Sequence, residues 1–224
     1  MAREVKKRKA FTLVEILIAL FIFSTVMVLA TGIFTSVIGG QSLINVNSNV
    51  SKESQRMMRQ ISDDVTNAIG IGSDGVSRTN IRGILFFKAN GAIFSESELK
   101  GCLDSTMATC NANGIVLFSK GKLKIYRLVV ASKQIEYAEA NSATLTLGAT
   151  GSIDFATYQF QSALSEKVEV GTLNFRGLAC YSTICDNMPF VQTEMVVQTK
   201  DYSQKAPSQR ANLHLRTITA GRSY

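Results

Sequence analysis

A single carboxylate, Glu15, stands inside a long apolar run, and charge pairing is the chemistry that its position could serve. No other charged residue occurs from Ile16 to Ser51. An acid within a membrane-spanning helix costs roughly 2.5–3.5 kcal/mol on insertion scales, so it should have a partner. If the chain is cut between Ala10 and Phe11, a new α-amino group appears one helical turn before Glu15. The carboxylate would then have a cation at the same membrane depth.

The element that must position Glu15 is a membrane helix. The dense apolar run, residues 11–38, exceeds the ~20 apolar residues that a spanning helix needs. Residues 1–10 hold five cations against one acid, and this basic flank predicts that the N-terminus stays in the cytoplasm. Everything after residue 40 should then lie outside the cytoplasm. Most of the net charge of +7 belongs to the first ten residues, so it is weak evidence for nucleic-acid binding by the rest.

Three interpretations of this start compete. The run could be an ordinary single-pass anchor. It could be a signal peptide cleaved after Ala30, because Val28-Leu29-Ala30 loosely fits a cleavage site. It could also be preceded by a leader that is removed before the apolar run. Only this third interpretation gives Glu15 a purpose.

Lys6-Lys7-Arg8-Lys9-Ala10, followed by Phe11-Thr12-Leu13-Val14-Glu15 and the apolar run, resembles a type IV pilin or type II secretion pseudopilin precursor. The resemblance implies that a prepilin peptidase cleaves between Ala10 and Phe11 and methylates the Phe11 amine. It also implies that Glu15 pairs with the N-terminus of a neighbouring subunit during assembly. The family usually has glycine where this chain has Ala10, and major pilins often have proline where it has Gly32.

The same resemblance implies the partners and the location. They are the prepilin peptidase, other pilin or pseudopilin subunits, an inner-membrane assembly platform, and membrane lipid before assembly. The chain would be a single-pass cytoplasmic membrane protein with its head outside the cytoplasm, and part of a cell-surface or periplasmic filament once assembled.

After the membrane segment the apolar pattern predicts a helical continuation. Apolar side chains recur at spacings of three or four and leave one stripe, formed by Val46, Val50, Met57, Ile61, Val65 and Ile69. This stripe should pack on a head domain. A helix over residues 11–69 would be roughly 90 Å long. Gly70 and Gly72 should stop it, and Gly39-Gly40 should be a weak point between its halves.

From residue 80 the apolar period changes to two, which is typical of strands. We expect strands in IRGILFFKAN, GIVLFSKGKLKIYRLVVAS, KQIEYAEA, SATLTLG, IDFATYQFQ, VEVGTLNFRGLACY, FVQTEMVVQTK and ANLHLRTIT. Short connections such as Lys120-Gly121 indicate antiparallel hairpins. The predicted fold class is therefore α+β: a long N-terminal helix with a C-terminal antiparallel β-rich pilin-type head. Its predicted parts are a cleaved basic leader, a transmembrane helix, an amphipathic helix and the head, at 1–10, 11–38, 39–69 and 70–224.

Four cysteines follow the membrane segment, and an even count in an exported domain suggests disulfides. Local pairing, Cys102 with Cys110 and Cys180 with Cys185, is the simplest of three connectivities. Buried free thiols are the alternative. Neither spacing has the two-residue gap usual for zinc, so we expect no metal site.

No catalytic constellation is visible in the sequence. His214 alternates with Leu213 and Leu215, which places it on the polar face of a strand if the leucines face inward. Asp186 and Asn187 offer too few oxygen ligands to predict a calcium loop. The chain has no phosphate loop, nucleophile elbow or positioned acid pair, so we expect neither enzyme activity nor a cofactor.

The sequence favours a structural function. A head of about 155 residues, 70–224, is large for a bulk filament subunit and resembles the J-type minor pseudopilins and W-type minor pilins, which sit at or near a filament tip. The alternative is a DNA-binding minor pilin of a competence pseudopilus. Its candidate phosphate-binding patch consists of Lys120, Lys122, Lys124, Arg127 and Lys133.

Overall fold

The structure is a computed structural model that describes residues 12–68, 70–73, 81–103, 111–178, 189–202, 204–207 and 210–220, with Arg82 and 100–103 described in backbone only. The chain forms two compact units, Met1–Asn45 and Val46–Tyr224. The division falls a few residues beyond Gly39-Gly40, both of which are helical.

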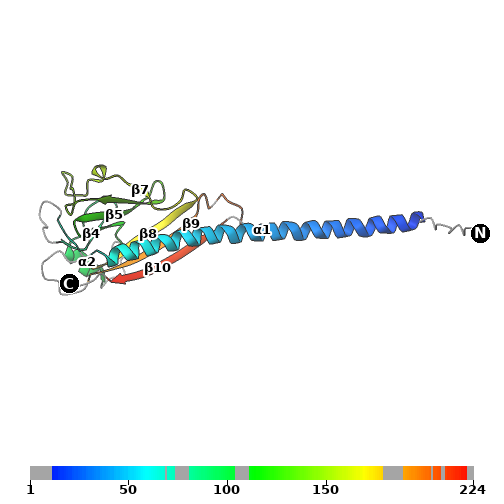
Figure 1. The fold of residues 1–224 in the computed structure, drawn as a ribbon, viewed down its shortest axis with the longest axis horizontal. Coiled ribbons are helices and arrows are strands. Elements are labelled where there is room, and N and C mark those ends of the chain that lie inside the picture. The colour runs from blue at the N-terminus through cyan, green and yellow to red at the C-terminus, as the bar shows by residue number, and fades with distance from the viewer. Residues whose placement is uncertain are drawn as a thin grey trace, which may run out of the picture. The chain divides into compact units, whose positions relative to one another are not determined.

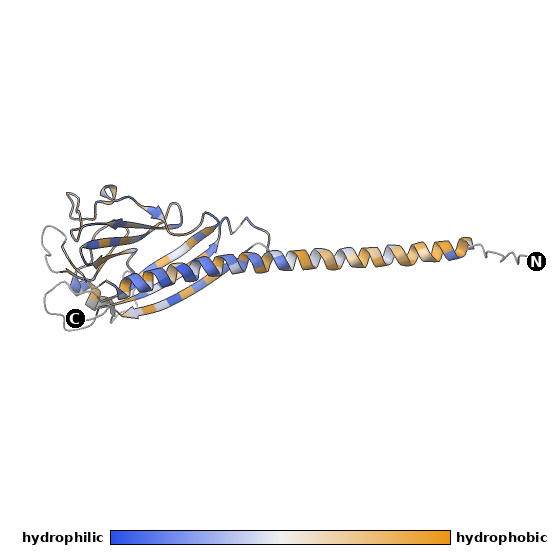
Figure 2. Ribbon diagram, viewed as in Figure 1, coloured by the Kyte–Doolittle hydropathy of each residue, from blue (hydrophilic) through white to orange (hydrophobic). Residues whose placement is uncertain are grey.

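The first unit consists of the N-terminal part of helix α1, which runs from Leu13 to Thr66. Its large apolar side chains from Leu13 to Ile38 are exposed, and none of the most apolar 18-residue window is buried. Figure 2 shows this part of α1 as predominantly apolar. Among the described residues, α1 is the one helix long and apolar enough to cross a membrane. Such a surface is stable where lipid or other protein covers it.

In the second unit α1 has the amphipathic character that the sequence predicts. Its buried side chains lie on one stripe and join the core of the head: Val50, Ser54, Met57, Met58, Ile61 and Val65. The buried Ser54 hydroxyl donates to the Val50 carbonyl of the preceding turn, so it costs little. The helix ends at Thr66, three residues before the predicted end at Ile69.

Two antiparallel sheets form most of the head and confirm the α+β class (Figure 1). The five-stranded sheet has the order β3-β4-β5-β6-β7, with bounds Ile84–Phe87, Gly114–Ser119, Lys122–Val129, Gln134–Ala140 and Gln161–Ser162. The three-stranded sheet has the order β10-β9-β8, with bounds Asn212–Ala220, Phe190–Thr199 and Val168–Leu178. A small pair joins β1 (Ile71–Gly72) to β2 (Ile81–Arg82).

Two of the predicted strands do not form as expected. The SATLTLG segment makes only isolated bridges, Ser73 with Thr144 and Leu147 with Ile153. The IDFATYQFQ segment contains a 3₁₀ helix, Phe155–Thr157, before the short β7. The reason is local, because Asp154 caps this 3₁₀ helix by accepting a hydrogen bond from the Ala156 N–H at 3.1 Å.

A helix that the strand pattern did not predict, α2, spans Glu96–Leu103. Ser95 and Glu98 form a capping box at its start: the Ser95 N–H donates to the Glu98 carboxylate at 2.7 Å, and the Glu98 N–H donates to Ser95 Oγ at 3.3 Å. The Lys88 ammonium, which donates to Glu98 at 2.8 Å, and the Ser95 N–H lower the pKa of Glu98 to about 2. The cap therefore stays ionised at any ordinary pH.

Strand β4 is buried on both faces, which explains its continuous apolar sequence GIVLF. Ile115 and Leu117 belong to the core that contains α1 and the three-stranded sheet. Val116 and Phe118 belong to a second core on the opposite face of the five-stranded sheet. The predicted hairpin at Lys120-Gly121 is confirmed, since both residues have positive φ and Ser119 pairs with Lys122.

Candidate assembly and processing site

Glu15 forms part of the first turn of α1, where it closes a capping box with Thr12. The Thr12 N–H and hydroxyl lie 3.2 and 3.4 Å from Glu15 Oε2, and the Glu15 N–H donates to Thr12 Oγ1 at 3.3 Å. Two free backbone donors of the helix start are satisfied in this way. The carboxylate is thus held at the positive end of the helix dipole. The Thr-x-x-Glu spacing would have revealed this arrangement from sequence.

Four hydroxyl groups in the apolar part of α1 are satisfied by the backbone of the same helix. The hydroxyls of Ser24, Thr25, Thr31 and Thr35 donate to carbonyls three or four residues earlier, at 2.6–3.0 Å. Such bonds remove much of the cost of placing a hydroxyl in lipid. Glu15 is the one charged residue in the stretch Leu13–Asn45.

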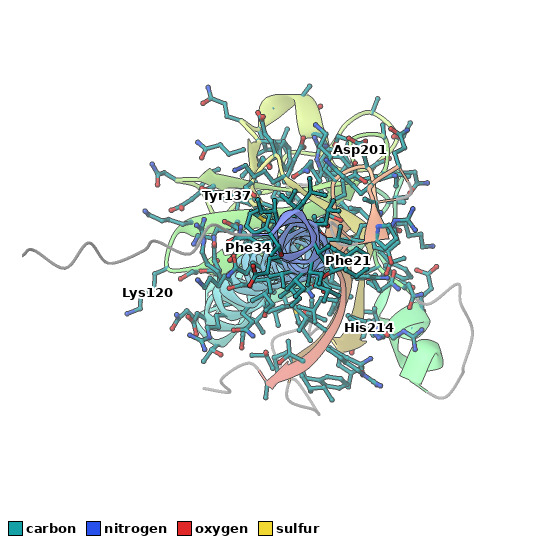
Figure 3. All side chains as sticks on the ribbon, turned by 90° about the vertical axis from the view of Figure 1, so that its right-hand side faces the viewer. Phe21, Phe34, Lys120, Tyr137, Asp201 and His214 are labelled. Carbon is teal, nitrogen blue, oxygen red and sulfur yellow. The ribbon has the colours of Figure 1, made fainter. Side chains whose placement is uncertain are left out.

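Glu15 borders a shallow apolar recess on the helix surface. The recess is lined by Glu15, Ile16, Ala19, Leu20 and Phe23. Figure 3 shows Phe21 and Phe34 projecting outward from the same helix. The surface beside the carboxylate is therefore apolar.

In the head, a polar contact joins α1 to strand β5. The buried Tyr126 hydroxyl donates to the Asp64 carboxylate of α1, and Lys124 Nζ lies 2.9 Å from the same carboxylate. Gln60 Nε2 donates to the Tyr126 hydroxyl at 3.2 Å. Burial, and then Asp64, raise the pKa of Tyr126 above its ordinary value, so its hydroxyl remains a donor. This contact fixes the amphipathic part of α1 on the sheet.

The predicted phosphate-binding patch is largely neutralised by carboxylates. Four of its five cations are ion-paired: Lys122 with Glu139, Lys124 with Asp64, Arg127 with Glu136 and Lys133 with Glu169, at 3.2, 2.9, 2.7 and 3.4 Å. Arg127 also stacks over the Phe160 ring at 3.8 Å. Lys120, which Figure 3 shows pointing away from the hairpin, has no carboxylate partner among the described residues. The local positive potential is therefore small.

His214 lies where the alternation predicts. Its side chain is exposed, and Nε2 lies 2.9 Å from the Glu194 carboxylate on β9. Leu213 and Leu215 point to the opposite face and pack against the core.

Several predicted site residues lie outside the part of the chain that the structure describes. They are Ala10, Phe11, Cys110, Cys180 and Cys185. Cys102 lies in α2, where the backbone alone is described. Cleavage, methylation and the two disulfides therefore stay predictions.

Comparison with protein families finds the prokaryotic N-terminal methylation motif at residues 5–31. The match covers Lys6–Lys9, Glu15 and most of the apolar run, and supports a type IV pilin-like prepilin signal. No curated protein and no solved structure matches the chain. Together with the one apolar helix, the signal is consistent with a single-pass membrane protein that a prepilin peptidase processes.

Proposed function

We propose that this chain is a minor structural subunit, a minor pilin or pseudopilin, of a type IV pilus-like filament or type II secretion pseudopilus. The observation that carries the proposal is the methylation motif on a helix whose apolar part is wholly exposed. In a filament, that surface is covered by the helices of neighbouring subunits. A structural subunit needs no active site, in agreement with the absence of a catalytic pattern from the sequence.

The proposed sequence of events begins with insertion of the apolar helix, its N-terminus in the cytoplasm and its head outside. The peptidase cleaves between Ala10 and Phe11 and methylates the new amine on Phe11. An assembly platform then brings subunits together, and the Glu15 carboxylate attracts the N-terminal amine of a neighbour. The helix leaves lipid as it packs into the filament, while the head keeps its fold.

A position at or near the tip agrees with the size of the head. A bulky head meets fewer steric limits at an end than when it is repeated along a packed shaft. The alternative, DNA binding by the cations near the β4–β5 hairpin, receives no support from their ion pairs, since paired cations release few counterions from DNA.

Labelling the head on intact filaments tests the proposed position. A small epitope placed at Gly151, in an exposed turn, should be detected at one filament end by electron microscopy. The same epitope at Gly121, in the exposed β4–β5 turn, is the matched control for accessibility. Label along the whole shaft would contradict the tip position but not the filament role. Filaments without label at either site would contradict both.

A further inference from the structure

Three connections of the head meet on one surface, which we call the basal surface. They are the β5–β6 turn, the β7–β8 connection and the described part of the β9–β10 loop, residues 130–133, 163–167 and 200–211. The Val170 N–H near the start of β8 donates to the Lys133 carbonyl at 2.8 Å. The Lys200 N–H donates to the Lys167 carbonyl at 3.0 Å. These backbone hydrogen bonds hold the three connections side by side.

The basal surface lies at the end of the head where α1 enters. Strand β10 and α1 run in the same direction (Figure 1), and the hydroxyl oxygens of Ser62 and Thr219 lie 2.9 Å apart. From Thr219 back to Ala211 the chain covers about 27 Å as a strand. From Ser62 back to Val46 it covers about 24 Å as a helix. Both therefore start at the same end of the head, where Figure 1 shows the β9–β10 loop.

The basal surface carries more cations than acids. Its charged residues are Lys133, Lys167, Lys200, Lys205 and Arg210 against Glu166, Glu169 and Asp201, which gives a net charge of +2. The buried Glu169 carboxylate lies 3.4 Å from Lys133 Nζ and accepts a hydrogen bond from the Asp201 N–H. The other three lysines are exposed and form no ion pair with any described residue. Helix α1 adds no charge at this end, because residues 46–51 have none.

Two further side chains make the basal surface amphipathic. Val130, in the β5–β6 turn, is 69% exposed. Tyr202 is half-buried, and the Arg210 guanidinium carbon lies 5.6 Å from the centre of its ring. Tyrosine and long cationic side chains are typical of the membrane–water interface, because their apolar parts contact lipid while their polar ends stay hydrated.

We propose that the basal surface binds the anionic lipid headgroups of the membrane that holds α1, before the subunit enters a filament. From Ile38, at the end of the apolar run, to Val46 the helix rises about 12 Å. The headgroup layer extends roughly 5–7 Å beyond the hydrocarbon. The remaining distance is shorter than a Debye length, about 8 Å at physiological salt, so the lysines act on the headgroups at this range.

A second copy of the basal surface is a poor partner for it. Two surfaces with the same excess of positive charge repel each other. Anionic lipids supply the opposite charge over a wide area, and basic side chains next to a membrane segment bind them for this reason. The length of the connection and the sign of the charge therefore both favour lipid.

Tryptophan fluorescence of the full-length protein in vesicles tests the proposal, which rests on the proposed membrane insertion of α1. The chain has no tryptophan, so Val130→Trp introduces a single reporter on the basal surface. Vesicles carry a nitroxide quencher on a headgroup and contain either neutral phosphatidylcholine alone or phosphatidylcholine mixed with anionic phosphatidylglycerol. Quenching should be about threefold stronger, or more, in the anionic vesicles, and this difference should disappear at high salt.

Ile71→Trp is the matched control. Ile71 is another exposed apolar residue, with an exposed fraction of 56%. The neighbouring Gly70 N–H donates to the Phe118 carbonyl beside the β4–β5 turn, which lies at the other end of β5 from Val130. Its quenching should be weak and equal in both kinds of vesicle.

A charge variant assigns the contact to the lysines. In the Val130→Trp protein, replacement of Lys167, Lys200 and Lys205 by glutamine should abolish the difference between the two kinds of vesicle. Replacement of three other exposed cations, Arg59, Lys120 and Lys122, by glutamine removes the same charge and should preserve the difference. Both variants should unfold at the wild-type temperature.

Each other outcome has a definite meaning. Equal quenching of Val130→Trp in neutral and anionic vesicles overturns the headgroup contact and leaves membrane insertion intact. A difference that survives loss of the three basal lysines overturns their assignment as the binding residues. Protein that does not float with either kind of vesicle overturns the membrane insertion on which both proposals depend.

Discussion

Replacing Glu15 with valine is expected to lower the amount of this protein in filaments at least about tenfold, a loss of about 1.4 kcal/mol or more of docking free energy. Cleavage, the level in the membrane and the stability of the head should stay unchanged. The membrane segment becomes more apolar in this variant, so its insertion should improve if anything. The head is a separate compact unit that begins at Val46, so the substitution should not alter the packing of its core.

The expected loss of docking free energy follows from the attraction between the Glu15 carboxylate and the amine of a neighbouring subunit. A carboxylate and an amine 4 Å apart attract by about 4 kcal/mol at an effective dielectric of 20, before desolvation is counted. The capping box lowers that desolvation cost, because Thr12 already donates to the Glu15 carboxylate in the free subunit. A net attraction of about 1–2 kcal/mol between the carboxylate and the amine is enough to bias the docking of one subunit on another.

A glutamine variant separates the charge from the cap. Glutamine can close the same capping box, but it has no charge. We therefore expect Glu15→Gln to be as defective as Glu15→Val. Asp63→Asn, which removes an exposed acid elsewhere on α1, is the control and should be recovered normally. Quantitative mass spectrometry of filaments measures the ratio. Normal recovery of Glu15→Val would show that the acid is not needed, and rescue by glutamine alone would assign Glu15 to capping.

Replacing Ile61 with alanine is expected to destabilise the head by about 2–5 kcal/mol, the range for buried isoleucine-to-alanine changes. Ile61 is fully buried on the α1 stripe, within the core that includes both sheets. Because a domain has only about 5–15 kcal/mol of stability, this is a large share of the total. Thermal unfolding of the full-length protein in detergent should shift down by at least about 5 °C.

Arg59→Ala, two residues earlier on the same helix, is the matched control. Arg59 is exposed and should change stability by no more than about 0.5 kcal/mol. If Ile61→Ala unfolds at the same temperature as Arg59→Ala, then α1 does not contribute to the core of the head. Such a result would contradict the packing of the second part of α1 on the head.

The spacing of apolar residues alone was sufficient to predict several elements. The stripe from Val50 to Val65 is buried as its spacing predicts, and the alternation in β9 and β10 matches the sides that face inward and outward. The Lys120-Gly121 hairpin followed from turn chemistry, because glycine readily takes positive φ. In these elements one physical preference acts without a competitor.

Local side-chain bonds overrode periodicity elsewhere. Helix α2 depends on the capping box of Ser95 and Glu98, and Asp154 starts a 3₁₀ helix where alternation predicts a strand. At the start of α1, Thr12 and Glu15 form a capping box of the same local kind. The position of β10 at the edge of its sheet depends on which strands become neighbours, a tertiary property that strand patterns do not contain.

The N-terminus of the protein recovered from isolated filaments tests the central claim most directly. Intact-mass and N-terminal peptide analysis should find a chain that begins at N-methylated Phe11 and still contains Glu15. A chain that begins at Thr31 would instead reveal cleavage after Ala30, as by a signal peptidase, and would remove Glu15 from the mature protein. That result, or an uncleaved Met1 terminus in filaments, would contradict the account.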